Sequence, residues 1–128
     1  MYLLIDTSQK EAIHLALFDK NEIFVASVRA QNRELLESID SFFVSKDFEK
    51  EHLKGIVVVV GEGGFTSTRI AVTVANTFGY ALQISLLAIS KEQSLDPQAL
   101  IEQTQSQPVG QYISASYSGE PNITKPKK

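Results

Sequence analysis

The sequence contains no cysteine and only two histidines, His14 and His52. Without cysteine, the chain can form no disulfide and has no thiol for nucleophilic chemistry. The two histidines lie far apart along the chain and do not have the spacing of zinc ligands. Neither can be linked to a nucleophile in a Ser-His-Asp arrangement. We therefore predict no metal site and no catalytic residue.

Positive charge and long apolar runs are also scarce. The formal net charge is −3, and the basic residues cluster only at the end of the chain, at Lys125, Lys127 and Lys128. Such a chain has no general basic field for nucleic acid, and a solubilising role for these lysines is favoured over contact with RNA phosphate. No apolar run has membrane-spanning length, and the first residues lack the basic region of a signal peptide. The sequence predicts a cytoplasmic protein that does not contact a membrane.

Length and composition are those of a single domain. The chain has 128 residues, of which 43% are hydrophobic and 21% are charged. This is enough to bury one core, and the proportions are typical of a soluble globular protein. We expect one domain over residues 1–118 and a basic C-terminal tail over residues 119–128.

The most informative stretch covers residues 57–82. Four consecutive valines at residues 57–60 indicate a strand that is buried on both faces. A glycine-rich turn follows at residues 61–64, and helical spacing then extends to Leu82. Along this helix, small residues recur every four positions beside a ridge of bulkier ones. The small-residue seam is Ala71, Ala75 and Gly79, and the ridge is Ile70, Val74 and Phe78.

The other segments also alternate between strand and helix patterns. Strands are expected at residues 2–5, 11–18, 23–29 and 84–89, helices at 32–46 and 97–105, a further turn at 49–54, and a short edge strand at 112–117. The first three strands form an antiparallel meander. Right-handed crossovers then give a mixed five-stranded sheet of order 3-2-1-4-5, with the two longer helices on one face and residues 91–118 covering the other. This predicts an α/β fold of ribonuclease-H-like topology, the topology of an actin/Hsp70-type lobe.

The two longer helices are the best candidates for binding a partner. The second is small or apolar around most of its circumference, whereas a surface helix of a single domain should show a broader polar face. A partner interface is therefore favoured over a helix pair used only to cover the sheet. The predicted contact residues are Leu36, Phe43, Thr68, Val72, Ala75, Asn76 and Gly79. This interpretation predicts that Ala75→Arg abolishes pairing and leaves a folded monomer.

A nucleotide site is a weaker candidate. Asp6 and Thr7 follow the first strand, and Mg²⁺ prefers one or two carboxylates together with phosphate oxygens. A strand-end turn in which Asp6 accepts backbone N–H groups is favoured instead. The glycine-rich turn matches neither common phosphate-binding motif, and Glu62 within it would repel an anion. We therefore predict no cofactor.

Arg69 lies in the first turn of the predicted second helix, where the helix dipole disfavours a cation. It should therefore have a specific acceptor. An internal carboxylate and a group on a partner both remain candidates for that acceptor.

The stretch at residues 61–70, G-E-G-G-F-T-S-T-R-I, resembles the G-P-G-S-F-T-G-L-R-I-G signature of the TsaB (YeaZ) family. Five positions of the signature differ in this chain. Glu62 replaces its proline, Gly64 its serine, Ser67 the glycine after its threonine, Thr68 its leucine and Ala71 its final glycine. Residues 3–8 resemble the opening strand of the family and residues 86–90 its fifth strand. Residues 32–36 occupy the place of its H-S-x-x-L motif but lack the histidine. The resemblance covers roughly residues 3–90.

This resemblance implies a function that the residues alone do not. TsaB proteins help to place threonylcarbamoyl on an adenosine of transfer RNA, and they pair with their catalytic paralogue TsaD, or with themselves, through the same two helices. The chain would then be a non-catalytic scaffold subunit, in a short form without the second lobe. Its partners would be a TsaD-type subunit, a TsaE-type ATPase as a further candidate, and transfer RNA only indirectly. The alternatives are a single actin-like lobe that binds ATP and Mg²⁺ through Asp6 and Thr7, and a homodimer that serves an unrelated partner.

Overall fold

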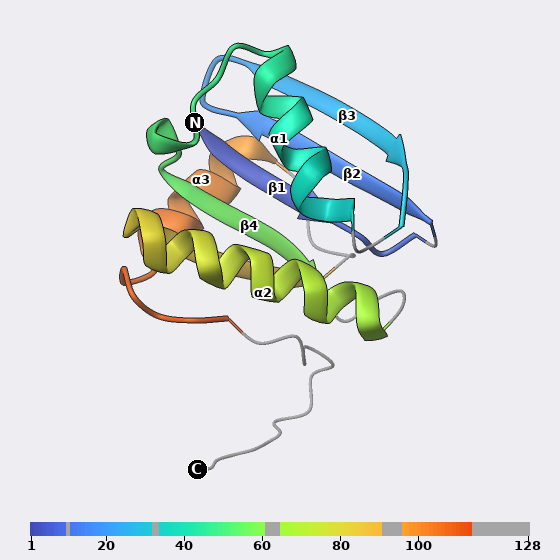
Figure 1. Ribbon diagram of the computed structural model, residues 1–128. Helices are drawn as coiled ribbons and strands as arrows, with labels where there is room; N and C mark the ends of the chain where they lie inside the picture. The colour runs from blue at the N-terminus through green and yellow to red at the C-terminus, as the bar shows by residue number, and fades with distance from the viewer. Residues whose placement is uncertain (10, 32–33, 61–64, 91–95, 114–128) are drawn as a thin grey trace.

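The computed structural model describes the chain apart from residues 10, 32–33, 61–64, 91–95 and 114–128 (Figure 1). Its strands are β1 (Tyr2–Asp6), β2 (Ala12–Phe18), β3 (Ile23–Arg29), β4 (Gly55–Val60) and β5 (Ser85–Ser90). Its helices are α1 (Leu35–Ser45), the short 3₁₀ helix η2 (Lys50–His52), α2 (Phe65–Leu82) and α3 (Pro97–Gln105). The predicted elements up to residue 105 are therefore present, with small shifts at their ends.

The strands form a single mixed sheet in the order β3-β2-β1-β4-β5, so the predicted order is confirmed. β1, β2 and β3 are antiparallel neighbours, whereas β4 pairs in parallel with both β1 and β5. Figure 1 shows α1 and α2 on one face of the sheet and α3 on the other. The predicted α/β class, with helices on both faces, is also confirmed.

The central strand β4 contributes to the core on both faces. All six of its residues are buried. Ile56, Val58 and Val60 face the core beneath α1 and α2, while Val57 and Val59 face the second core beneath α3. The uninterrupted valines predicted this arrangement because a strand covered on both faces needs no polar side.

Two glycines allow helices to approach the sheet closely. A Cβ atom on Gly79 of α2 would lie 2.9 Å from Cδ1 of Leu86 in β5. A Cβ atom on Gly55 of β4 would lie 2.7 Å from Cγ2 of Thr104 in α3. Both separations are shorter than a normal carbon–carbon contact, so only glycine fits these positions without a shift of the neighbouring element.

Residues 107–113, which we call the strap, connect the end of α3 to the flank of α2 (Figure 1). The Ser85 hydroxyl donates to the carbonyl of Gln107 at 2.7 Å, and Asn76 bonds the backbone of Ile113. The strap thus crosses from one face of the sheet to the other. Residues 111–113 are not in a strand, and the rest of the edge strand predicted at 112–117 lies outside the described residues, as does the predicted tail.

Candidate partner-binding groove

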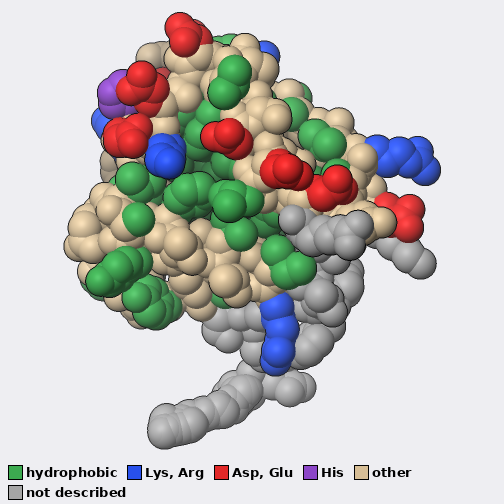
Figure 2. Space-filling model, viewed as in Figure 1, with side chains coloured by type: hydrophobic (Ala, Val, Ile, Leu, Met, Phe, Trp, Pro, Cys, Tyr) green, Lys and Arg blue, Asp and Glu red, His purple; other side chains and the backbone are tan. Residues whose placement is uncertain are grey.

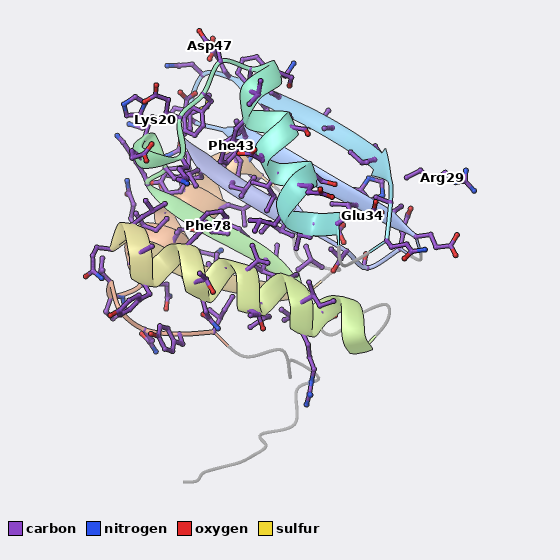
Figure 3. The ribbon with its side chains drawn as sticks, in the orientation of Figure 1. Lys20, Arg29, Glu34, Phe43, Asp47 and Phe78 are labelled. Atoms are coloured by element: carbon purple, nitrogen blue, oxygen red, sulfur yellow. The ribbon has the colours of Figure 1, made fainter. Side chains whose placement is uncertain are left out.

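An open groove of about 480 Å³ lies between α1 and α2. Phe43 from α1 and Phe78 from α2 both line it, and Figure 3 labels these two side chains. The full lining, which comes from α1, α2 and η2, is Leu36, Glu37, Ile39, Asp40, Phe43, Lys50, Thr73, Val74, Thr77 and Phe78. The groove is therefore built by the two helices that the sequence singled out.

The floor of the groove is apolar, and its rim is partly exposed. Ile39 and Phe43 are only 1% and 4% exposed and belong to the core, whereas Leu36 at the rim is 56% exposed. Val74 and Phe78 are half-buried on the α2 side. Figure 2 shows hydrophobic side chains gathered between the two helices, with acidic side chains along α1. Such a surface suits an apolar partner that carries a few basic groups at its margin.

The charged residues of the groove do not form a recognisable reaction centre. Its lining includes two carboxylates, Glu37 and Asp40, and one ammonium group, Lys50. Across the described part of the chain, no three His, Asp or Glu side chains gather closely enough to hold a metal ion.

The predicted contact residues divide into two groups. Leu36 and Phe43 line the groove. By contrast, Thr68, Val72 and Ala75 are 4%, 6% and 0% exposed, and Gly79 packs against Leu86. The outward direction expected for the small-residue seam is therefore wrong. The seam faces β4 and β5 because its small side chains let α2 approach the sheet, and a partner on the outer surface could not reach it.

Asn76 has a structural role that the sequence did not predict. Its Oδ1 accepts the N–H of Ile113 at 3.0 Å, and its Nδ2 donates to the carbonyl of the same residue at 3.1 Å. The amide thus binds both backbone groups of one strap residue, 37 positions along the chain. Whether Asn76 also touches a partner stays a prediction, but its side-chain amide is engaged within the chain.

Half of the groove residues that the sequence did not predict lie on α2. The unpredicted residues are Glu37, Ile39, Asp40, Lys50, Thr73, Val74, Thr77 and Phe78. The ridge of bulkier residues on α2 was the available signal, since Val74 and Phe78 belong to it. The seam and the ridge repeat at the same spacing, however, and the spacing does not reveal which of them faces the sheet.

The surroundings of the weaker candidates can be described from the structure. Asp6 and Thr7 are 8% and 2% exposed, and Oδ1 of Asp6 accepts the N–H of Ser8 at 2.9 Å, as in the favoured strand-end turn. His14 lies between Gln9 and Ser27, with ring nitrogens 3.1 Å and 2.8 Å from their side-chain oxygens. Arg69 is exposed on α2, and the glycine-rich turn lies outside the described residues.

None of the helices in the described part of the chain is long and apolar enough to cross a membrane.

Comparison with known proteins agrees with this geometry. The model of the family TsaD, tRNA N6-adenosine threonylcarbamoyltransferase, matches residues 25–118. YeaZ from Pseudomonas aeruginosa is 28% identical with a TM-score of 0.65, and the match covers 80% of this chain and 49% of that one. A second structure, of an uncharacterized protein with similarity to peptidase YeaZ from the same organism, is 27% identical with a TM-score of 0.63. That match covers 70% of this chain and 42% of the other. No curated protein matches the chain.

The chain thus spans less than half the length of these two solved structures, at 49% and 42%. The part that matches is the lobe with the sheet order and helix arrangement described above. Because the family model covers most of the sequence, from residue 25 to residue 118, the chain belongs to the TsaD/YeaZ (TsaB) family.

Proposed function

We propose that this chain is a non-catalytic scaffold subunit that pairs, through α1 and α2, with a TsaD-type subunit that modifies transfer RNA with threonylcarbamoyl. The observation that carries the proposal is the apolar groove of about 480 Å³ between these helices, in a lobe of this family. A TsaE-type ATPase would join the same assembly, and transfer RNA would be contacted through the catalytic subunit.

An exposed aliphatic side chain at the rim of the groove supports this assignment. Leu36 of α1 lines the groove and is 56% exposed. Burial of apolar surface yields about 25 cal/mol per Å², so a partner that covers this side chain and fills the groove gains free energy. Helices that dock into an apolar groove are a common mode of recognition.

The non-catalytic part of the proposal rests on Asp6. In an actin-like lobe this residue is the natural candidate to organise Mg²⁺ and phosphate, yet here its Oδ1 caps the backbone of Ser8. The described residues place no other carboxylates beside it to make a three-residue metal cluster. A subunit that recruits a catalytic partner needs no such cluster.

The test is the mass in solution of this chain mixed with the TsaD-type subunit of its own organism. We expect sedimentation velocity to show a one-to-one complex. Leu36→Arg and Thr73→Arg should each weaken that complex at least tenfold, because each places a cation at the apolar groove. Gln103→Arg puts the same side chain on an exposed position of α3, across the sheet, and should leave the complex intact.

Two results would overturn the proposal. One is the absence of any complex between the wild-type chain and the TsaD-type subunit. The other is a complex whose affinity is the same in wild type, Leu36→Arg and Thr73→Arg, since binding would then use another surface. Circular dichroism of each variant ensures that the comparison is made between folded proteins.

A further inference from the structure

β3 forms one edge of the sheet, and no described strand pairs with its outer side. It pairs with β2 residue by residue over its full length, from Ile23 to Arg29, without a bulge. Its sequence, IFVASVR, contains no proline and no charge before the final arginine. Edge strands of soluble proteins usually carry lysine, proline, an inward charge or a bulge that blocks pairing with another strand. β3 has none of these between Ile23 and Val28.

The backbone groups on this edge can be assigned from the hairpin. The N–H of Asp19 donates to the carbonyl of Glu22 at 2.9 Å, and the N–H of Ala30 donates to the carbonyl of Glu11 at 3.2 Å. Hydrogen-bonded pairs alternate along an antiparallel ladder, so even-numbered residues of β3 bond to β2. The odd-numbered residues therefore direct their N–H and C=O groups outward. They are Ile23, Val25, Ser27 and Arg29.

The same odd-numbered residues carry the exposed apolar side chains. Ile23 is 55% exposed and Val25 is 70% exposed. They lie on the α3 side of the sheet, since Val25 is opposite Ala16, which belongs to the core beneath α3. Helix α3 packs on β4 and β5 and does not cover them. On the other side of the sheet, by contrast, Phe24 is half-buried, with the Lys46 ammonium 5.3 Å from its ring centroid.

We propose that this edge binds a second copy of the chain, with β3 antiparallel to β3 across a two-fold axis, which joins the two five-stranded sheets into one. In an antiparallel pair about this axis, the outward groups of Val25 and its neighbours meet the same groups of the other copy. Main-chain pairing at a free edge is an established mode of recognition. It also brings the exposed valine and isoleucine side chains of the two copies together, as cross-strand neighbours.

The charges at the two ends of β3 favour a second copy as the occupant. Glu22 directly precedes the strand and Arg29 ends it, and both side chains are exposed. Asp19, in the preceding turn, is partly buried. The N–H groups of Asn21 and Glu22 lower the pKa of its carboxyl group, and the N-terminal ammonium and Lys54 act in the same direction, so its charge is balanced within its own chain. Antiparallel pairing places the Arg29 end of each copy beside the Glu22 end of the other, and Figure 3 shows Lys20, in the turn before β3, and Arg29 at opposite ends of the strand.

This edge is separate from the groove between α1 and α2. β3 ends the sheet on the side of α1 that faces away from α2 (Figure 1). Self-pairing through β3 would therefore leave the groove accessible, and an assembly with two catalytic partners would contain two copies of each chain. The proposal does not depend on the identity of the partner that binds at the groove.

Two equally exposed valines provide a matched test. Val25 on β3 and Val44 on α1 are 70% and 73% exposed. We expect the full chain alone to sediment as a dimer over a concentration series. Val25→Lys should weaken the dimer at least tenfold, because it sets like charges across the pairing edge. Val44→Lys should leave the dimer unchanged. A chain that stays monomeric at every concentration, or a dimer that is lost in Val44→Lys and kept in Val25→Lys, would overturn the proposal.

Hydrogen exchange gives a second and more specific readout. The amides of Phe24, Ala26 and Val28 bond to β2 and should be protected at every protein concentration. The amides of Ile23, Val25 and Ser27 should be protected only where the chain is dimeric. Rapid exchange of these three amides in a sample that sediments as a dimer would show that the copies pair elsewhere.

Discussion

Two rows of residues run along α2, the small-residue seam and the bulkier ridge. Both repeat every four positions, but their surroundings are very different. On the inner side, Ala71 and Ala75 are 0% exposed and Gly79 packs against Leu86. On the side that faces α1, Val74 and Phe78 are bulkier yet only half-buried, and they line an open groove. The larger apolar residues are thus the more exposed ones.

The greater exposure of the larger apolar residues has a simple cause. A helix packs closest to a sheet where its side chains are smallest, so Gly79 and the two alanines settle against β4 and β5. The bulkier ridge is then directed toward α1, which shares only a narrow contact with α2. A small-residue stripe therefore marks the closest internal contact here, and the partner surface lies beside it.

The largest expected effect comes from a charge on the inner side. Ala75→Arg should destabilise the fold by more than about 4 kcal/mol, because it forces a long cation into a fully buried position. Urea unfolding followed by circular dichroism measures this change. The result expected from sequence, a folded monomer that fails to pair, would contradict the inner placement of the seam.

Asn76→Asp should have the next largest effect. The substitution keeps the acceptor for the Ile113 N–H but replaces the donor with an oxygen that faces the Ile113 carbonyl. We expect a loss of about 2 kcal/mol, the usual cost of a partly buried polar group without its partner. Hydrogen exchange should show faster exchange at residues 107–113 and little change in β4. Unchanged protection of the Ile113 amide would mean that the strap does not depend on Asn76.

Gly79→Ala should cost less, about 1 kcal/mol. The added methyl would lie 2.9 Å from Leu86 and overpack the contact, which usually costs 1–3 kcal/mol, while roughly 1 kcal/mol is recovered from the better helix propensity of alanine. Tyr80→Ala, at the adjacent 68% exposed position, is the control and should change stability by less than about 0.5 kcal/mol. A stabilised Gly79→Ala variant would argue against close packing of α2 on β5.

The smallest effect on stability is expected at the groove. Thr73 is exposed, so Thr73→Arg should change the free energy of unfolding by less than about 0.5 kcal/mol. The same variant should nevertheless impair pairing with a TsaD-type subunit. The contrast with Ala75→Arg, two residues along the same helix, separates the two sides of α2 in one thermal-unfolding experiment. Severe destabilisation by Thr73→Arg would mean that this side is also internal.

Much of the fold could be predicted because its signals are local. The valine run of β4 showed that both of its faces are covered, and the short polar turns between the first three strands indicated a meander. Right-handed crossovers then constrained the order of the strands, and the predicted order agrees with the structure. The site was harder to predict. Leu36 and Phe43, which the sequence predicted as partner contacts, line the groove. Val72, Ala75 and Gly79 were assigned outward because their spacing does not specify the element that covers them.

By itself, the sequence determined the element order, the sheet order and the identity of the two helices that form the groove. Periodicity and turn residues act over a few neighbours, and right-handed crossovers act on whole elements. Only the tertiary structure decided which side of α2 became core, that Asn76 would hold Ile113, and which backbone groups of β3 point outward. These features depend on contacts between distant segments and on strand register, which local patterns do not encode.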